Sequence, residues 1–128
     1  MIPRFRAWDK ENKKMIDVDI LNWNNGEVDF IGDGITFILK ANDIELMQST
    51  GLTDKNGKEI FEGDILSIET DEENVKVEVS WDSKHALFAF ESKKYNEKEP
   101  LAELFEDNSY PFKIIGNIWE DGELLDGD

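Results

Sequence analysis

Apolar and polar residues alternate along most of this chain, and that period of two predicts a mainly β protein. The clearest strand is residues 75–81, where three valines and Trp81 alternate with polar side chains. This alternation places Trp81 on the buried face of the strand. Apolar runs at 65–68 and 86–90 lie on either side of it in the sequence, so the three segments are predicted to form a meander.

A first hairpin is predicted from two segments, residues 2–8 and 15–21, joined by the polar turn at 9–13. Within the second segment, Asp17 and Asp19 fall on the face opposite the apolar residues. Two carboxylates on one face are also what a glycosidase would need. We favour the simpler interpretation, in which both are on the solvent side of a half-buried strand.

A second hairpin is indicated by Asn25-Gly26, a pair suited to the positive φ angles of a type I′ turn. The segments that it would join are residues 21–23 and 28–31. Further strands are expected at 35–40 and 44–48, which are short apolar runs.

Residues 50–64 are rich in turn-forming residues. Asp54-Lys55-Asn56-Gly57 is a typical turn sequence, and Glu62-Gly63-Asp64 predicts a sharp corner just before an apolar strand. A calcium loop of the EF-hand type would need its glycine at position 6 and oxygen ligands at positions 1, 3 and 5. Counted from Asp54, the glycine is too early and a lysine occupies a ligand position, so we expect a plain turn.

The last third of the chain contains the only helical spacing. Pro100 precedes Leu101, Leu104 and Phe105, which would share one face of a short helix near residues 100–107. Residues 93–99 before it are predicted to be a charged loop. A closing strand is expected at 112–119, with Gly116 as a possible bulge.

These elements predict a small SH3-like barrel or a β-meander core, with an N-terminal β-hairpin extension and one short helix. The expected organisation is a single β-rich domain at 1–119, with hairpins in 1–48 and the barrel-like core in 58–119. Residues 120–128 form an acidic tail, whose last few residues are expected to be mobile.

Composition narrows the classes of function. The chain has 128 residues, no cysteine and a net charge of −16. The lack of cysteine excludes disulfides and thiolate metal sites, and the negative charge argues against a nucleic acid as partner, because binding to its phosphates needs basic residues. No apolar run is long enough to span a bilayer, and no apolar stretch follows the first arginines as in a signal peptide, so we expect a cytoplasmic protein. The first 14 residues are locally basic. Arg4, Arg6, Lys13 and Lys14 are therefore candidate interaction residues.

Candidate chemistry is sparse. The single histidine, His85, falls in a predicted turn, where it lacks the second ligand or paired base that a metal or nucleophilic site requires. The sequence contains no glycine-rich phosphate loop and no nucleophile elbow. We therefore expect neither enzymatic activity nor a bound metal or cofactor.

The four tryptophans are candidate stacking surfaces for bases or sugars. Trp81 lies on the predicted buried face, and Trp8 and Trp119 lie in terminal segments that must close the fold, so core positions are expected for these three. Trp23 adjoins the Asn24-Asn25-Gly26 turn. It is expected to be exposed and is a further candidate interaction residue.

Three phrases resemble the YopX family, small proteins of bacteriophages and prophages. They are FRAWDKENKKMI at 5–16, LMQSTGLTDKNGKEIFEGDI at 46–65 and IIGNIWEDGELL at 114–125. The chain departs from the family pattern at Asp121-Gly122, where Asn-Pro is expected. The resemblance implies a phage or prophage origin, a bacterial cytoplasm and a mainly β fold, and supplies no catalytic or binding residues. The shared positions are expected to be structural: Trp8, Gly51, Asp54, Gly57, Gly63, Asp64 and Trp119.

Three functions are compatible with these features. The favoured hypothesis is a non-enzymatic accessory module that binds a host or phage protein, or assembles with itself through its basic and acidic ends. A second is a DNA mimic whose carboxylates stand where phosphates would lie. Its candidate acids are Glu97, Glu99, Glu103, Glu106, Asp107 and the tail. A third is nucleic-acid binding through the basic first hairpin.

Overall fold

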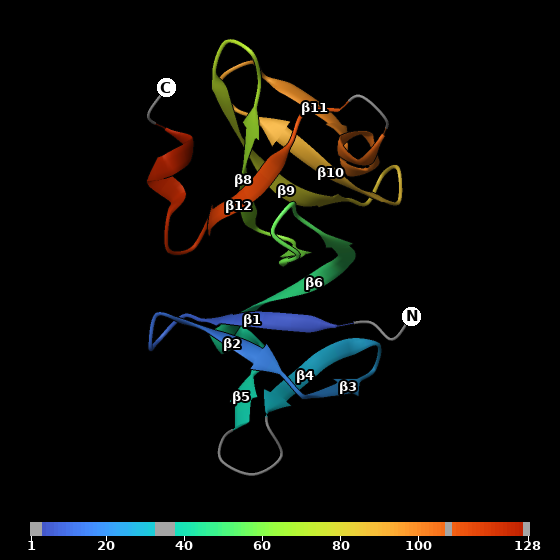
Figure 1. Ribbon diagram of the computed structural model, residues 1–128. Helices are drawn as coiled ribbons and strands as arrows, with labels where there is room; N and C mark the ends of the chain where they lie inside the picture. Colours follow the sequence, from blue (N-terminus) through green and yellow to red (C-terminus); the bar gives the residue numbers. More distant parts are fainter. Residues whose placement is uncertain (1–3, 33–37, 107–108, 127–128) are drawn as a thin grey trace. The chain divides into compact units, whose positions relative to one another are not determined.

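The computed structural model describes residues 4–32, 38–106 and 109–126. The chain divides into two compact units, Met1–Ser49 and Thr50–Asp128, both built from antiparallel strands (Figure 1). The predicted mainly β fold is therefore confirmed. The helical segments among the described residues are too short to cross a bilayer.

The first unit contains two small sheets. Its elements are β1 (Phe5–Asp9), β2 (Lys14–Val18), β3 (Ile20–Asn24), β4 (Glu27–Gly32), β5 (Ile38–Lys40), the 3₁₀ turn η1 (Ala41–Asp43) and the start of β6 (Ile44–Thr53). In one sheet β1 lies between β2 and β6, and in the other β4 lies between β3 and β5. The end of β6 belongs to the second unit, where β7 (Glu59–Phe61) is the next strand in the sheet order.

Strand register explains the core of the first unit. Ala7 lies opposite Ile16 on β2 and Leu46 on β6, so the period of two points these side chains to one face. That face packs against apolar residues of the other sheet. The buried cluster consists of Ala7, Ile31 and Ile44, with Val18, Leu21, Val28, Leu39 and Leu46 packed around it.

Both predicted hairpins of this unit are confirmed, with one correction. Asn25 and Gly26 have φ angles of 54° and 82°, as a type I′ turn requires. The predicted strand 15–21 is wrong in extent, because the chain breaks at Asp19 and residue 20 starts β3 in the other sheet. An alternating pattern cannot reveal such a break, since it continues across both strands. Part of the predicted strand at 35–40 lies outside the described residues, and Ile38–Lys40 forms β5.

The second unit is a curled antiparallel half-barrel. Its main elements are β8 (Asp64–Glu69), β9 (Asn74–Asp82), β10 (Leu87–Ser92), β11 (Glu97–Pro100), the 3₁₀ helix η2 (Leu101–Phe105), β12 (Phe112–Asn117) and the 3₁₀ turn η3 (Gly122–Leu125). The sheet order is β11-β10-β9-β8-β12, which confirms the predicted meander and leaves β11 and β12 as the two edges (Figure 1).

One face of this sheet holds the larger core, which includes Ile60, Leu66, Ile68, Val77, Val79, Leu101, Leu104 and Phe112. The predicted short helix is present as η2, but it is a 3₁₀ helix. With about three residues per turn, positions i and i+3 share a face, whereas position i+4 does not. Leu101 and Leu104 are accordingly buried, and Phe105 remains 42% exposed.

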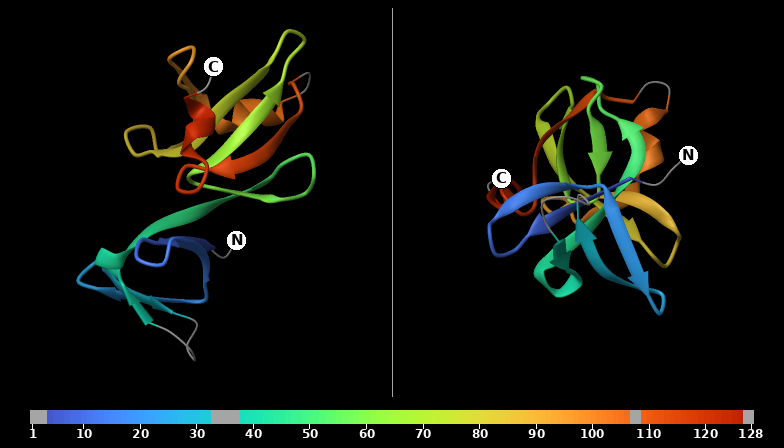
Figure 2. Two further views of the ribbon diagram at one scale, coloured as in Figure 1. Left: turned by 90° about the vertical axis from the view of Figure 1, so that its left-hand side faces the viewer. Right: turned by 90° about the horizontal axis from the view of Figure 1, so that it is seen from below.

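Three further predictions for this unit need correction. The expected loop at 93–99 contains strand β11, which pairs with β10. The closing strand ends at Asn117, and its register shifts between Ile114 and Gly116, which confirms an irregularity there. In the predicted tail, Gly122–Leu125 forms η3, which lies beside β9 (Figure 2). The last two residues lie outside the described part of the chain.

Of the four predictions of tryptophan burial, two are confirmed and two are wrong. Trp8 is buried and Trp23 is 55% exposed, as predicted, but the core positions expected for Trp81 and Trp119 are wrong. Trp81 is 45% exposed at the end of its strand pair, where its ring packs edge-on against Phe88 at 5.0 Å. Trp119 is 37% exposed in the turn after β12. Alternation predicts which face a side chain points to, but not whether that face is covered at that position.

Candidate functional site

The basic candidate residues lie at different places on the first hairpin. Arg6 is opposite Asp17 in the register of β1 and β2, so two opposite charges face each other across the strands. Arg4 is exposed just before β1. Lys14 is opposite Asp9 at the other end of the hairpin, next to the exposed Lys13. Three register positions separate Arg6 from the Lys14 end, or roughly 10 Å.

Trp23 is the other candidate interaction residue of the first unit. It lies on β3, in a different sheet from Arg6 and Lys14, and its exposed side chain is close in sequence to the Asn25-Gly26 turn. The five candidates therefore do not come from a single sheet. Their role in binding remains a prediction.

The central turn motif is organised by Asp54, which is almost fully buried. Its carboxylate accepts hydrogen bonds at 2.9 Å from the backbone N–H groups of Asn56, Lys58 and Ile114. Burial opposes ionisation, but these three donors outweigh it and hold the pKa of Asp54 below its usual value. Gly57 completes the turn with a φ of 79°. The carboxylate thus binds backbone and closes the turn.

The corner at Glu62-Gly63-Asp64 joins three strands. Gly63 donates its N–H to the carbonyl of Val79 and accepts a hydrogen bond from the N–H of Ile118, both at 2.8 Å. The buried Asp64 accepts the N–H of Phe61 at 2.8 Å. The motif residues of this segment therefore have local structural contacts. Gly51, which also has a positive φ, lies in strand β6, just before the turn at residues 54–57.

A third buried aspartate, Asp9, was not singled out from the sequence. Its carboxylate accepts the backbone N–H groups of Glu11 and Asn12 and the Asn12 side-chain amide. The Asn12 bonds are the main reason that the pKa of Asp9 is lowered. A sequence signal was available, because Asp followed by a polar turn is typical of such side-chain to backbone bonds.

The half-barrel contains a groove of about 350 Å³ that we call the β11 groove. Its floor is apolar, formed by Ile68, Val75, Val77 and Phe90. Its polar walls are Thr70, Ser92 and Tyr95. Its rim is formed by four carboxylates, Glu72, Glu73, Glu97 and Glu99.

Strand register brings these residues together. Ile68 lies opposite Val75, and Phe90 lies opposite Glu99 on the edge strand β11. Glu99 therefore lies on the same face of the sheet as the apolar floor. The charged residues at 93–99 predict a loop. This prediction does not reveal that Glu97 and Glu99, at alternate positions of β11, face the interior of the half-barrel.

The rim already contacts one cation from the chain itself. Lys94 forms an ion pair with Glu73 at 2.7 Å, and its ammonium lies 5.3 Å from the centre of the Tyr95 ring. Next to the groove, burial together with the charges of Glu99 and Glu106 raises the pKa of Glu103. The negative charge of the rim thus continues onto η2.

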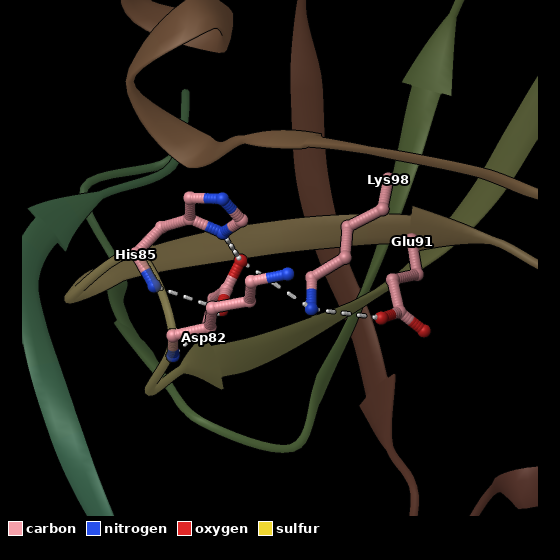
Figure 3. Close-up of polar contacts among 5 residues, drawn as sticks. Asp82, His85, Glu91 and Lys98 are labelled. Carbon is pink, nitrogen blue, oxygen red and sulfur yellow. Dashed lines mark hydrogen bonds and ion pairs between the residues drawn. The ribbon is translucent and has the colours of Figure 1, made fainter.

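A second polar cluster lies at the turn between β9 and β10 (Figure 3). His85 Nδ1 lies 2.8 Å from the Asp82 carboxylate, and Lys98 lies between Asp82 and Glu91, at 3.6 and 3.5 Å. Asp82 also accepts the backbone N–H groups of Lys84 and His85. The bond to His85 lowers the pKa of Asp82. His85 is exposed, and the bonds of this cluster stabilise the turn.

On the face of the sheet opposite the β11 groove, which is also the face of Asp82, Glu78 lies directly across from Glu91. Burial first, and then the charge of Glu91, raises the pKa of Glu78. Lys93 reaches Asp126 of the C-terminal segment at 2.5 Å, and this bond raises the pKa of Lys93. Within the described ranges, no three acidic or histidine side chains are grouped so as to hold a metal ion.

Half-barrel and strand order define a small, mainly β protein with backbone-binding aspartates in its turns. The model of the protein family described as YopX protein matches residues 4–126, so the chain belongs to the YopX family. It is similar to protein EF1440 from Enterococcus faecalis, at 29% identity and a TM-score of 0.68, over 98% of this chain and 99% of that one.

Protein yopX from Bacillus subtilis has the same fold. It matches at 18% identity and a TM-score of 0.64, over 95% of this chain and 97% of that one. No curated protein matches the sequence.

Proposed function

We propose that this YopX-family protein is a non-enzymatic accessory module of a phage or prophage that works by binding another protein in the bacterial cytoplasm. The observation that carries the proposal is the β11 groove, which is lined by both apolar side chains and four carboxylates. Concave apolar sites with a few polar groups are the usual places where proteins bind ligands.

The chemistry near the groove favours binding over catalysis. Acid catalysis would need carboxyl groups with distinct roles and a paired base or nucleophile. Here Asp54 and Asp9 use their carboxylates to hold backbone N–H groups, and His85 is exposed in a turn away from the groove lining. These three potential acids and bases therefore have contacts that stabilise turns.

The test is capture of a binding partner that depends on the groove. The protein would be immobilised and exposed to lysate of a bacterial host, beside two variants of equal net charge. One variant, E97Q/E99Q, alters the rim, and the control, E11Q/E27Q, alters exposed acids of the first unit. We expect a protein retained by the native chain and by the control but lost with the rim variant. Retention that is equal for all three, or retention of nothing, would contradict the proposal.

Self-assembly is the other form that binding could take, through the basic first hairpin and the acidic second unit. Light-scattering mass on a sizing column at about 0.05 M and about 0.5 M salt distinguishes the two forms, because exposed charges are screened within a few ångströms at the higher salt. A defined oligomer that dissociates with salt would support assembly between copies. A monomer at both concentrations would leave a different protein as the partner.

A second candidate function is a DNA mimic, favoured by the carboxylates of Glu99 and Glu106 near Glu103, whose charges, together with burial, raise the pKa of Glu103. In a mimic, such neighbouring carboxylates would stand where the phosphates of a nucleic acid lie. Among the predicted acids, Asp107 lies outside the described residues. A mimic should displace labelled DNA from a basic DNA-binding protein, and this displacement should weaken steeply with salt. Displacement that is insensitive to salt would contradict the DNA-mimic function.

A further inference from the structure

We propose that the β11 groove binds an extended segment of a partner protein that carries both basic and apolar side chains on one face, at every second position, and that this segment adds as a strand to the free edge of β11. This inference rests on the proposed binding function and identifies the partner's chemistry.

The groove presents two kinds of surface to an occupant, an apolar floor and an acidic rim. Ile68 and Val77 are buried, but Val75 and Phe90 are only half-buried, so the floor offers apolar surface that an occupant would cover. Each square ångström of apolar surface that is covered contributes about 25 cal/mol. An occupant therefore needs apolar side chains that reach the floor.

The rim specifies the charge of the occupant. The residues that line the groove include four glutamates and no basic side chain. Lys94 already shows how a cation is held there, since its ammonium contacts Glu73 and the face of Tyr95. Lysine and arginine side chains suit this environment, because their aliphatic stems cover apolar surface while the charged ends reach carboxylates.

Strand β11 supplies the backbone component. In the described sheet its one neighbour is β10, so its other edge is available to a further strand. Glu97 and Glu99 both point towards the groove face, opposite Ser92 and Phe90. A strand added beside β11 would alternate in the same way, with every second side chain over the groove. An extended segment fits this arrangement, whereas a helix would not form the edge hydrogen bonds.

A different explanation exists for the same glutamates. Inward-pointing charges on an edge strand discourage edge-to-edge aggregation. That role requires charge alone and predicts no affinity for any peptide. Binding of a defined peptide therefore separates the two explanations.

The probe is a fluorescent peptide of about six residues, the length of an ordinary strand, in which Lys and Leu occupy every second position in turn, so that they share one face, and Ser occupies the positions between them. Its anisotropy would be measured with the full chain. Three matched peptides serve as controls: Glu replaces Lys in one, Ser replaces Leu in another, and the third carries N-methyl groups on alternate backbone amides. We expect each change to weaken binding at least about tenfold, because charge, apolar contact and strand pairing are each required.

The protein variants are E97Q/E99Q, E11Q/E27Q and Tyr95→Ala, each checked for an unchanged unfolding transition. We expect E97Q/E99Q to weaken the Lys-Leu peptide about tenfold and Tyr95→Ala to weaken it less, with E11Q/E27Q unchanged. Equal weakening by both double variants would overturn the inference, since net charge alone would then explain binding. Full binding of the N-methylated peptide would overturn strand addition.

A small diamine is the remaining competitor for the site. If 1,4-diaminobutane displaced the peptide completely at equal concentration, the groove would be a site for free amines and the inference would fail. The outcome of lysate capture is separate. A partner lost with E97Q/E99Q while the Lys-Leu peptide fails to bind would leave the proposed function standing and remove only this inference.

Discussion

The Asp54 carboxylate accepts a hydrogen bond at 2.9 Å from the backbone N–H of Ile114, which lies 60 residues later in the chain. One oxygen closes the local turn at 54–58, and the other fixes the last strand of the half-barrel. We predict that Asp54→Ala lowers the free energy of unfolding by about 2–4 kcal/mol, because buried N–H groups lose their acceptor. Denaturant unfolding measures this, with Asp71→Ala at an exposed turn as a control of near-zero effect.

The Asp54 carboxylate also predicts how the free energy of unfolding changes with pH. Because the pKa of Asp54 is lowered in the folded state, its contribution is fully present above the ordinary aspartate pKa. The contribution is lost as the pH falls through the lowered value. Unfolding curves between about pH 6 and pH 2 should therefore show a smaller acid-induced loss in Asp54→Asn than in the native chain. An identical acid loss in both proteins would contradict this assignment.

The turns were the most predictable part of the fold, because their chemistry is local. Asn25-Gly26 and the 54–57 turn need only positive φ angles and a short side-chain acceptor, both of which are visible in the sequence. The break at Asp19 and the exposure of Trp81 depend on which segments pack on which face. No local pattern contains that information, since the alternation is the same whether or not a face is covered.

Two turn positions with positive φ provide opposite tests of backbone strain. Gly57 has a φ of 79° with open space around its missing side chain, whereas Ala86 has a φ of 54°. We predict that Gly57→Ala destabilises by about 1 kcal/mol and that Ala86→Gly is stabilising by about 0.5 kcal/mol, since a left-handed conformation penalises Cβ. Thermal unfolding of both variants measures the two signs. The same sign for both would show that packing rather than strain decides.

Glu78 provides a prediction with the opposite pH dependence. Burial and the facing Glu91 raise the pKa of Glu78 in the folded state. The folded chain then loses stability as the pH rises from the ordinary glutamate pKa through the raised value. We predict that Glu78→Gln is stabilising by about 0.5 kcal/mol near pH 7, and has no effect near pH 3, where both states are protonated. Equal stabilisation at both pH values would mean that packing and not charge is responsible.

The groove could not be found from the sequence, although its residues are ordinary. In the sequence, Glu97 and Glu99 resemble solvated loop charges, but the pairing of β11 with β10 places Glu99 opposite Phe90 and Glu97 opposite Ser92. Pairing of an edge strand depends on a turn at Asn96, which adopts a φ of 51° without being glycine. The charge of the rim was visible in the composition, but the apolar floor beside it comes from three other segments of the chain.

Gly116 lies at the irregular point of the closing strand, and a close contact explains why it has no side chain. A Cβ there would lie 2.5 Å from the Asp121 carboxylate, which accepts the N–H of Asn117 at 3.1 Å. We predict that Gly116→Ala costs about 1–3 kcal/mol, because Asp121 must move and release that hydrogen bond.

The control for this prediction is Gly122→Ala, since nothing lies within 4 Å of a Cβ at that position. It should change the unfolding midpoint little. If Asp121 is the cause, Gly116→Ala should cost much less in a chain that already carries Asp121→Ala, because the two residues are coupled. Equal costs in both backgrounds would assign the effect of Gly116 to the strand irregularity itself.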